Sequence, residues 1–228
     1  MDGALLSLIA ASVVFVGTHF LLSHPLRAPL VARVGERGFL GLYSLVSLAA
    51  FAWMVIAFRR VPPYQPPAWS GYDEVSWTLA SLLTILALVL FLGSLKGNPA
   101  FPEAHVPDLG SRTPSGVYAV TRHPMMWGFA LWAIAHMLVM PTPRVLVLDT
   151  AILVLALVGA HFQDRKKAAL LGGGWGKWQA QTHYWPRWRN LARAGVALWI
   201  GALVAWVLVT WAHVWFADVP AGIWRWVA

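Results

Sequence analysis

The sequence contains no cysteine. Disulfide bonds, thiolate metal ligands and covalently attached c-type haem all need a cysteine sulfur, so all three are excluded. Charged residues are also scarce. They make up 11% of the chain, whereas soluble domains carry roughly 25%. This scarcity argues against a soluble protein.

A basic segment is missing before the first apolar stretch, because Asp2 is the only charged residue that precedes Arg27. Secretory signal peptides begin with a positively charged region. We therefore expect the first apolar stretch to remain a membrane helix and not to be cleaved. Internal repeats and low-complexity tracts are absent too, so we expect a single domain over residues 1–228.

Apolar residues are abundant, at 59% of the chain, and 15 residues are tryptophan, which favours the membrane interface. A helix needs about 20 mainly apolar residues to cross a bilayer, and six stretches approach that length. The sequence predicts an all-α, polytopic transmembrane helical bundle of about six helices. The expected helices cover Ala4–Ser23, Gly38–Phe58, Val75–Leu95, Met125–Met140, Val145–Phe162 and Ala192–Phe216.

The basic residues are divided unequally between the two sides of such a bundle. Thirteen of the 17 Lys and Arg residues fall in the three loops on one side, and four fall on the other. The positive-inside rule places the basic loops in the cytoplasm and both termini on the non-cytoplasmic side. Topology thus explains the net charge of +8. We expect membrane lipid as a partner but no nucleic acid, since no nucleic-acid-binding module accompanies these charges.

Four histidines lie in or beside the expected helices. His19, His136 and His161 fall within them, and His123 begins the fourth. Ionisable groups in a bilayer are costly and indicate function, and histidine is a common ligand of haem iron. A haem b bound by two histidines is one hypothesis. The other is that each histidine makes an ordinary hydrogen bond between helices.

Depth limits which histidines can share one iron. His136 lies thirteen residues beyond His123, or roughly 20 Å deeper at about 1.5 Å per residue. His19, His123 and His161 fall near the cytoplasmic face. The helical geometry therefore favours His19 with His123 or His161.

The segment Gly116–Gly128 places Arg122 and His123 directly before a membrane helix that Pro124 can begin. Arg122 suits a phosphate, a carboxylate or a haem propionate, or it is simply a cytoplasmic anchor. Asp164 can pair with Arg122, although we favour a basic stop signal facing anionic lipid for this region. The Trp-rich and basic stretch Trp175–Trp188 predicts a short helix on the membrane surface.

These motifs resemble those of the NnrU family, which includes bacterial denitrification-associated membrane proteins and plant and cyanobacterial zeta-carotene cis–trans isomerases. The similarity covers about residues 10–190, with the last expected helix outside its strongest part. It rests on His19, Ser23-His-Pro-Leu-Arg27, Gly35-Glu-Arg37, Tyr43-Ser-Leu45, Thr121-Arg-His-Pro124, Gly128, Trp132, Ala135-His136, Gly159-Ala-His161, Asp164-Arg165 and Trp175.

The resemblance implies a haem b, and the family's ligand candidates fall on His19 and His136. This pair conflicts with the depth argument, so His123 and His161 stay open as alternatives to His136. The implied function is a cis–trans isomerase-like enzyme acting on an apolar polyene that enters from the lipid. An accessory factor in nitrite and nitric oxide reduction is equally implied, with respiratory or denitrification proteins as partners, in the bacterial inner membrane.

The Arg-His-Pro block is also similar to that of isoprenylcysteine and phospholipid methyltransferases, which bind S-adenosylmethionine at the cytoplasmic face. Two departures count against methyl transfer. Met126 stands where those enzymes usually have an aromatic residue, and Asp164 stands alone where they have an acidic pair. A non-enzymatic accessory protein is the third reading.

Overall fold

The computed structural model describes residues 3–101 and 109–227. Within these ranges the chain is helical and contains no strand. Five of the described helices are long and apolar enough to cross a membrane, and α4 is a shorter apolar helix. The predicted all-α membrane fold is confirmed. The five long helices are α1 (Gly3–Ser23), α2 (Arg27–Arg60), α3 (Glu74–Ser94), α5 (Pro143–Leu171) and α7 (Val196–Ala217), and the shorter α4 covers Pro124–Val139.

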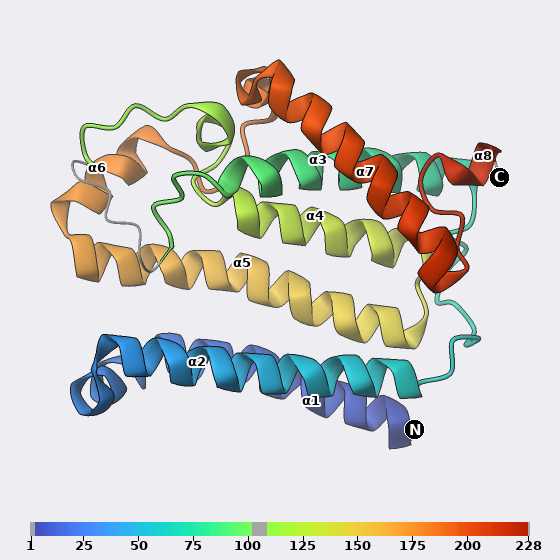
Figure 1. Cartoon of the computed structure of the whole chain (residues 1–228), viewed down its shortest axis with the longest axis horizontal. Coiled ribbons are helices and arrows are strands. Elements are labelled where there is room, and N and C mark those ends of the chain that lie inside the picture. Colours follow the sequence, from blue (N-terminus) through green and yellow to red (C-terminus); the bar gives the residue numbers. More distant parts are fainter. Residues whose placement is uncertain (1–2, 102–108, 228) are drawn as a thin grey trace.

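The helices are arranged side by side, with α5 between the α1–α2 hairpin and the α3–α4 pair, and with α7 lying across α3 (Figure 1). The start of α1 and the short helix α8 (Trp224–Val227) lie at one end of the bundle. The connections from α1 to α2 and from α3 to α4 lie at the opposite end, which we call the basic end (Figure 1). Which end faces the cytoplasm stays a prediction from the charge distribution.

Two helices are longer than the sequence indicates. Helix α2 begins at Arg27 instead of Gly38, and it continues through a kink at Gly35, whose φ is 74°. A positive φ is readily adopted only by glycine. Helix α5 runs past Phe162 to Leu171, because Asp164 and Lys167 find buried positions on its inner face. Hydropathy marks only the apolar part of each helix, whereas both helices continue into polar sequence.

The Trp-rich region forms a short helix, as predicted, and most of its residues are exposed, but its two tryptophans face inward. Trp175 and Trp178 of α6 (Gly173–Gln181) are both fully buried. The ring of Trp178 lies 6.1 Å from that of Tyr118, and the Arg112 guanidinium lies 5.6 Å from the Trp178 ring. The preceding 3-10 turn, η1 (Gly116–Ala119), therefore packs over α6. Another 3-10 segment, η2 (Trp188–Ala194), then leads into α7.

Candidate functional site

The chain before α4 is fixed by backbone pairing with the chain after α6. The Arg122 amide donates a hydrogen bond to the His183 carbonyl at 2.8 Å. The fully buried Thr121 hydroxyl lies 3.1 Å from the same carbonyl and 2.8 Å from that of Tyr184. The position of Arg122 and His123 is thus set by two segments about sixty residues apart.

Four side chains then meet at the basic end of α4 and α5, and we call them the polar cluster: Arg122, His123, Gln163 and Asp164. Arg122 Nε donates to both carboxylate oxygens of Asp164 at 2.9 Å, and its Nη2 donates to Oδ2 as well. His123 Nε2 lies 2.9 Å from Asp164 Oδ1, and Nδ1 lies 3.2 Å from Gln163 Oε1. Asp164 is therefore a buried acceptor for two cationic or donor side chains. The alternative favoured from sequence, a stop signal facing lipid, is wrong for Asp164.

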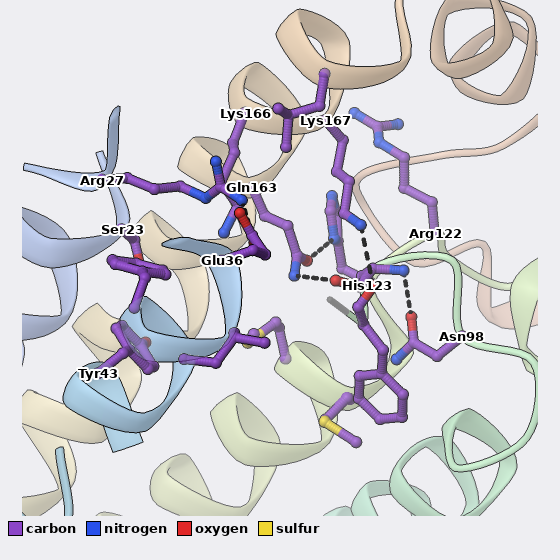
Figure 2. A pocket seen from close by; sticks show the side chains of 17 residues that line it. Ser23, Arg27, Glu36, Tyr43, Asn98, Arg122, His123, Gln163, Lys166 and Lys167 are labelled. Carbon is purple, nitrogen blue, oxygen red and sulfur yellow. Dashed lines mark hydrogen bonds and ion pairs between the residues drawn. The ribbon is translucent and has the colours of Figure 1, made fainter. Parts of the chain in front are cut away.

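The polar cluster borders two adjoining cavities between the α1–α2 hairpin, α4 and α5. The polar cavity, of about 490 Å³, is lined by Arg122 and His123 (Figure 2). The apolar cavity, of about 500 Å³, is lined by His19. Both volumes lie within the range of about 300–1,000 Å³ usual for ligand pockets. The two cavities share the lining residues Ser23, Tyr43, Met126, Gln163 and Lys166.

The polar cavity carries an excess of positive charge. Arg27 pairs with Glu36, and Arg122 pairs with Asp164. Among the residues described, Lys167 donates to the Phe101 carbonyl, at 3.1 Å, and forms no ion pair. Lys166 forms no hydrogen bond or ion pair with any residue that the structure describes, although it lines both cavities. The arrangement suits a ligand with an anionic group (Figure 2).

The apolar cavity presents one ring nitrogen of His19. The Nδ1 atom donates to the Phe15 carbonyl at 2.7 Å, and the ring lies 4.4 Å from the Phe15 ring and 5.6 Å from the Tyr43 ring. Within the described part of the chain, Nε2 has no hydrogen-bond partner. A histidine whose Nδ1–H is held by a backbone carbonyl presents Nε2 as a metal ligand. The other walls include Phe20, Phe51, Phe129, Ile152 and Leu155.

His24 also lines the apolar cavity, at the end nearest the basic residues. Burial lowers the pKa of His24, and the charges of Lys166 and Arg165 lower it further. The lowered pKa favours the neutral imidazole of His24. The positive charge around the cavities comes from arginine and lysine.

The two remaining candidate histidines lie elsewhere. His136 is near the far end of α4, where its Nδ1 donates to the Trp132 carbonyl at 2.9 Å and its ring lies 6.4 Å from that of His213. His161 is exposed on α5, with its ring 5.9 Å from Phe162. Neither lines the polar or the apolar cavity. The structure brings His19, His123 and Arg122 to adjoining cavities, and it does not bring His136 or His161 to them.

Sequence reasoning missed His24, Gln163 and Lys166 as lining residues. Gly159, Gln163 and Lys166 follow one another at helical spacing of four and three residues, and all three line the apolar cavity. The sequence contains this spacing, but the spacing identifies cavity-lining residues only if α5 is known to continue past Phe162.

No group of three or more His, Cys, Asp or Glu residues is placed to hold a metal ion within the ranges described. A haem needs only one or two ligands from the protein, since its porphyrin supplies the rest. The apolar cavity offers two imidazoles, those of His19 and His24, beside lysines that form no ion pair within the described part of the chain, and this set fits that requirement. The donor set of this chain is thus compatible with haem.

One family model, described as NnrU protein, matches residues 7–221. The matched region includes α7, beyond the part where the sequence motifs are strongest. No curated protein matches the chain, and no solved structure matches it.

Proposed function

The chain belongs to the NnrU family, and from this premise we propose that it is a haem b-binding protein of the bacterial inner membrane with His19 as an iron ligand. One observation carries the proposal. A histidine with an available Nε2 lies in an apolar cavity, and that cavity adjoins a cationic one.

Haem is amphiphilic, with an apolar macrocycle and two propionate carboxylates. The apolar cavity suits the macrocycle, and the adjoining polar cavity suits the propionates. Phe20, Phe51 and Phe129 would provide apolar walls for the macrocycle. Lys166 would provide a cation for a propionate, with Arg27, which pairs with Glu36, also lining the polar cavity. Charge-assisted bonds of this kind are roughly twice as strong as neutral ones.

If His19 held a haem, the haem would supply redox and Lewis-acid chemistry in the apolar cavity. We propose that the protein acts there as a cis–trans isomerase-like enzyme on an apolar polyene, or serves as an accessory factor in nitrite and nitric oxide reduction beside respiratory or denitrification proteins. A cavity between membrane helices favours a lipid-soluble ligand, because such a ligand reaches it from the bilayer.

Haem titration of the detergent-solubilised protein tests the proposal, with absorption in the Soret region as the readout. We expect His19→Ala to abolish stoichiometric binding. We expect His136→Ala and His161→Ala to retain it, because neither residue lines either cavity. His183→Ala, in a loop, is the matched control. Full haem retention in His19→Ala would remove the assigned ligand, and loss in His136→Ala would support the pair implied by family resemblance.

S-adenosylmethionine binding is the second candidate, favoured by the polar lining that Asn98, Arg122 and His123 give the polar cavity. Equilibrium dialysis with labelled S-adenosylmethionine separates the two proposals. Binding that requires Asn98 and Arg122, in a protein that takes up no haem, would establish a methyltransferase-type cofactor site instead.

A further inference from the structure

Asp149 is a carboxyl group buried inside the membrane-spanning part of α5. Only 1% of its surface is exposed, and neither carboxylate oxygen has a hydrogen-bond partner among the residues described. None of the ion pairs found in the described chain includes it. An isolated ionised carboxylate in apolar surroundings is very costly. The protonated form of the carboxyl group is therefore strongly favoured at this position.

The position of Asp149 connects it to the apolar cavity. Ile152 and Ala156, three and seven residues further along α5, both line that cavity. Residues at these spacings lie on one face of a helix. Asp149 thus lies on the cavity-lining face of α5, roughly one helical turn, or about 5 Å, beyond the cavity.

The same face leads in the other direction to Thr142, the residue that precedes α5 at the end of the bundle remote from the basic end. Thr142 is seven residues before Asp149, or roughly 10 Å along the helix axis. Its hydroxyl is also buried and has no partner within the described chain. Thr142 and Asp149 therefore place two buried oxygen-bearing side chains without a described partner between the end of the bundle and the cavity, and Arg144 Nε of α5 is a further buried atom without one.

A third oxygen-bearing side chain of this kind lies on the neighbouring helix. Helix α1 packs against α5, and the two run in the same direction (Figure 1). Ser12 of α1 is buried, and its hydroxyl has no partner in the described part of the chain. Ser12 precedes the cavity residue Phe15 by three positions, as Asp149 precedes Ile152. Since buried polar groups are almost always satisfied, these three oxygen-bearing side chains indicate a place for water and for an exchangeable proton.

We propose that Asp149 is a proton-exchanging carboxylic acid that connects the Thr142 end of the bundle to the apolar cavity. Asp149 gives its proton to a water molecule in the cavity, which becomes hydronium, and Asp149 is a carboxylate for that interval. It then regains a proton that is delivered as hydronium through water held near the Thr142 hydroxyl. The proposal rests on the burial and position of Asp149 and is independent of haem.

Infrared spectroscopy of the haem-free protein in lipid tests it directly. We expect a carbonyl-stretch band of a protonated carboxylic acid at neutral pH, with a shift to lower wavenumber after transfer to D2O. Asp149→Asn should remove the band, and Asp149→Glu should retain it at a changed position, which assigns the band even if the first variant is unstable. Asp73→Asn, which changes an exposed acid, is the matched control and should leave the band unaltered.

Thr142→Val tests the route. This variant keeps the side-chain shape and removes the hydroxyl, so the band should persist while its shift in D2O becomes at least several-fold slower. A spectrum without the band would overturn the protonated state. A band that never shifts, or that shifts equally fast in Thr142→Val, would overturn proton exchange by this route. A His19→Ala protein that binds no haem but keeps the band separates this inference from the proposed function.

Discussion

Asp164→Asn isolates the contribution of the buried ion pair that organises the polar cluster. The Asp164 side chain is 9% exposed and that of Arg122 is 12% exposed. Asparagine has nearly the same shape as aspartate but no charge. The variant therefore leaves the Arg122 guanidinium buried without a counter-charge, and it replaces one acceptor oxygen by an NH2 group that faces the donors Arg122 and His123.

We expect Asp164→Asn to lower the free energy of unfolding strongly. Removing one partner of a buried ion pair costs about 3–5 kcal/mol. For a chain of this size, 1 kcal/mol corresponds to roughly 2–4 °C in Tm, so Asp164→Asn should lower the Tm by roughly 6–20 °C. The control is Glu36→Gln, which breaks the Arg27–Glu36 pair, whose side chains are 23% and 50% exposed. An exposed pair contributes about 1 kcal/mol at most, so the Tm of Glu36→Gln should fall by less than about 4 °C.

Thermal unfolding in a mild detergent, followed by intrinsic tryptophan fluorescence, measures both variants. The double variant Arg122→Met/Asp164→Asn should recover part of the loss, because it removes the unpaired charge as well. Equal small shifts in Asp164→Asn and Glu36→Gln would refute the reasoning. The reasoning would also be refuted if the double variant lost more in Tm than the summed losses of Arg122→Met and Asp164→Asn.

Three further variants test other parts of the fold. Gly128→Ala places a Cβ 2.9 Å from the Ala87 carbonyl oxygen of α3, so the α3–α4 contact must open at a cost of about 1–3 kcal/mol, measurable as a lower Tm. Thr121→Val leaves the His183 and Tyr184 carbonyls without their hydroxyl donor and should cost about 1–3 kcal/mol in the same assay; an unchanged Tm would show that water replaces the hydroxyl. Asp73 accepts hydrogen bonds from the amide and the hydroxyl of Ser76, which lower its pKa, the amide most. Because its pKa is lower folded than unfolded, Asp73 stabilises α3 above the usual aspartate range and loses this effect as pH falls through that range. The Tm deficit of Asp73→Ala should therefore be full at neutral pH and shrink in acid, and a deficit independent of pH would contradict the N-cap role.

The membrane fold could be predicted from the sequence because long apolar stretches alone indicate membrane helices. Stretches such as Val75–Leu95 differ from α3 by one residue at each end. The errors occur where polar residues continue a helix. Arg27 to Arg37 look like a loop by hydropathy, yet they form the start of α2, because their backbone hydrogen bonds are satisfied within the helix outside the apolar layer.

The site was only partly predictable, for a different reason. Arg122 and His123 are adjacent to a helix start and could be located from local sequence. Their partner Asp164 is 42 residues from Arg122, and helical spacing alone does not decide between an ion pair and a lipid-facing stop signal. The burial of Trp175 and Trp178 likewise depends on η1 packing over α6, a contact between distant segments that the interfacial preference of tryptophan cannot reveal.

The most direct test of the haem proposal is an absorption spectrum of the wild-type protein, purified in mild detergent from cells supplied with ample haem, before and after reduction. The proposal predicts a Soret band and reduced α and β bands of a b-type haem, at about one haem per chain. A protein that shows no Soret band, either as purified or after added haem, would contradict the assignment of the apolar cavity to haem.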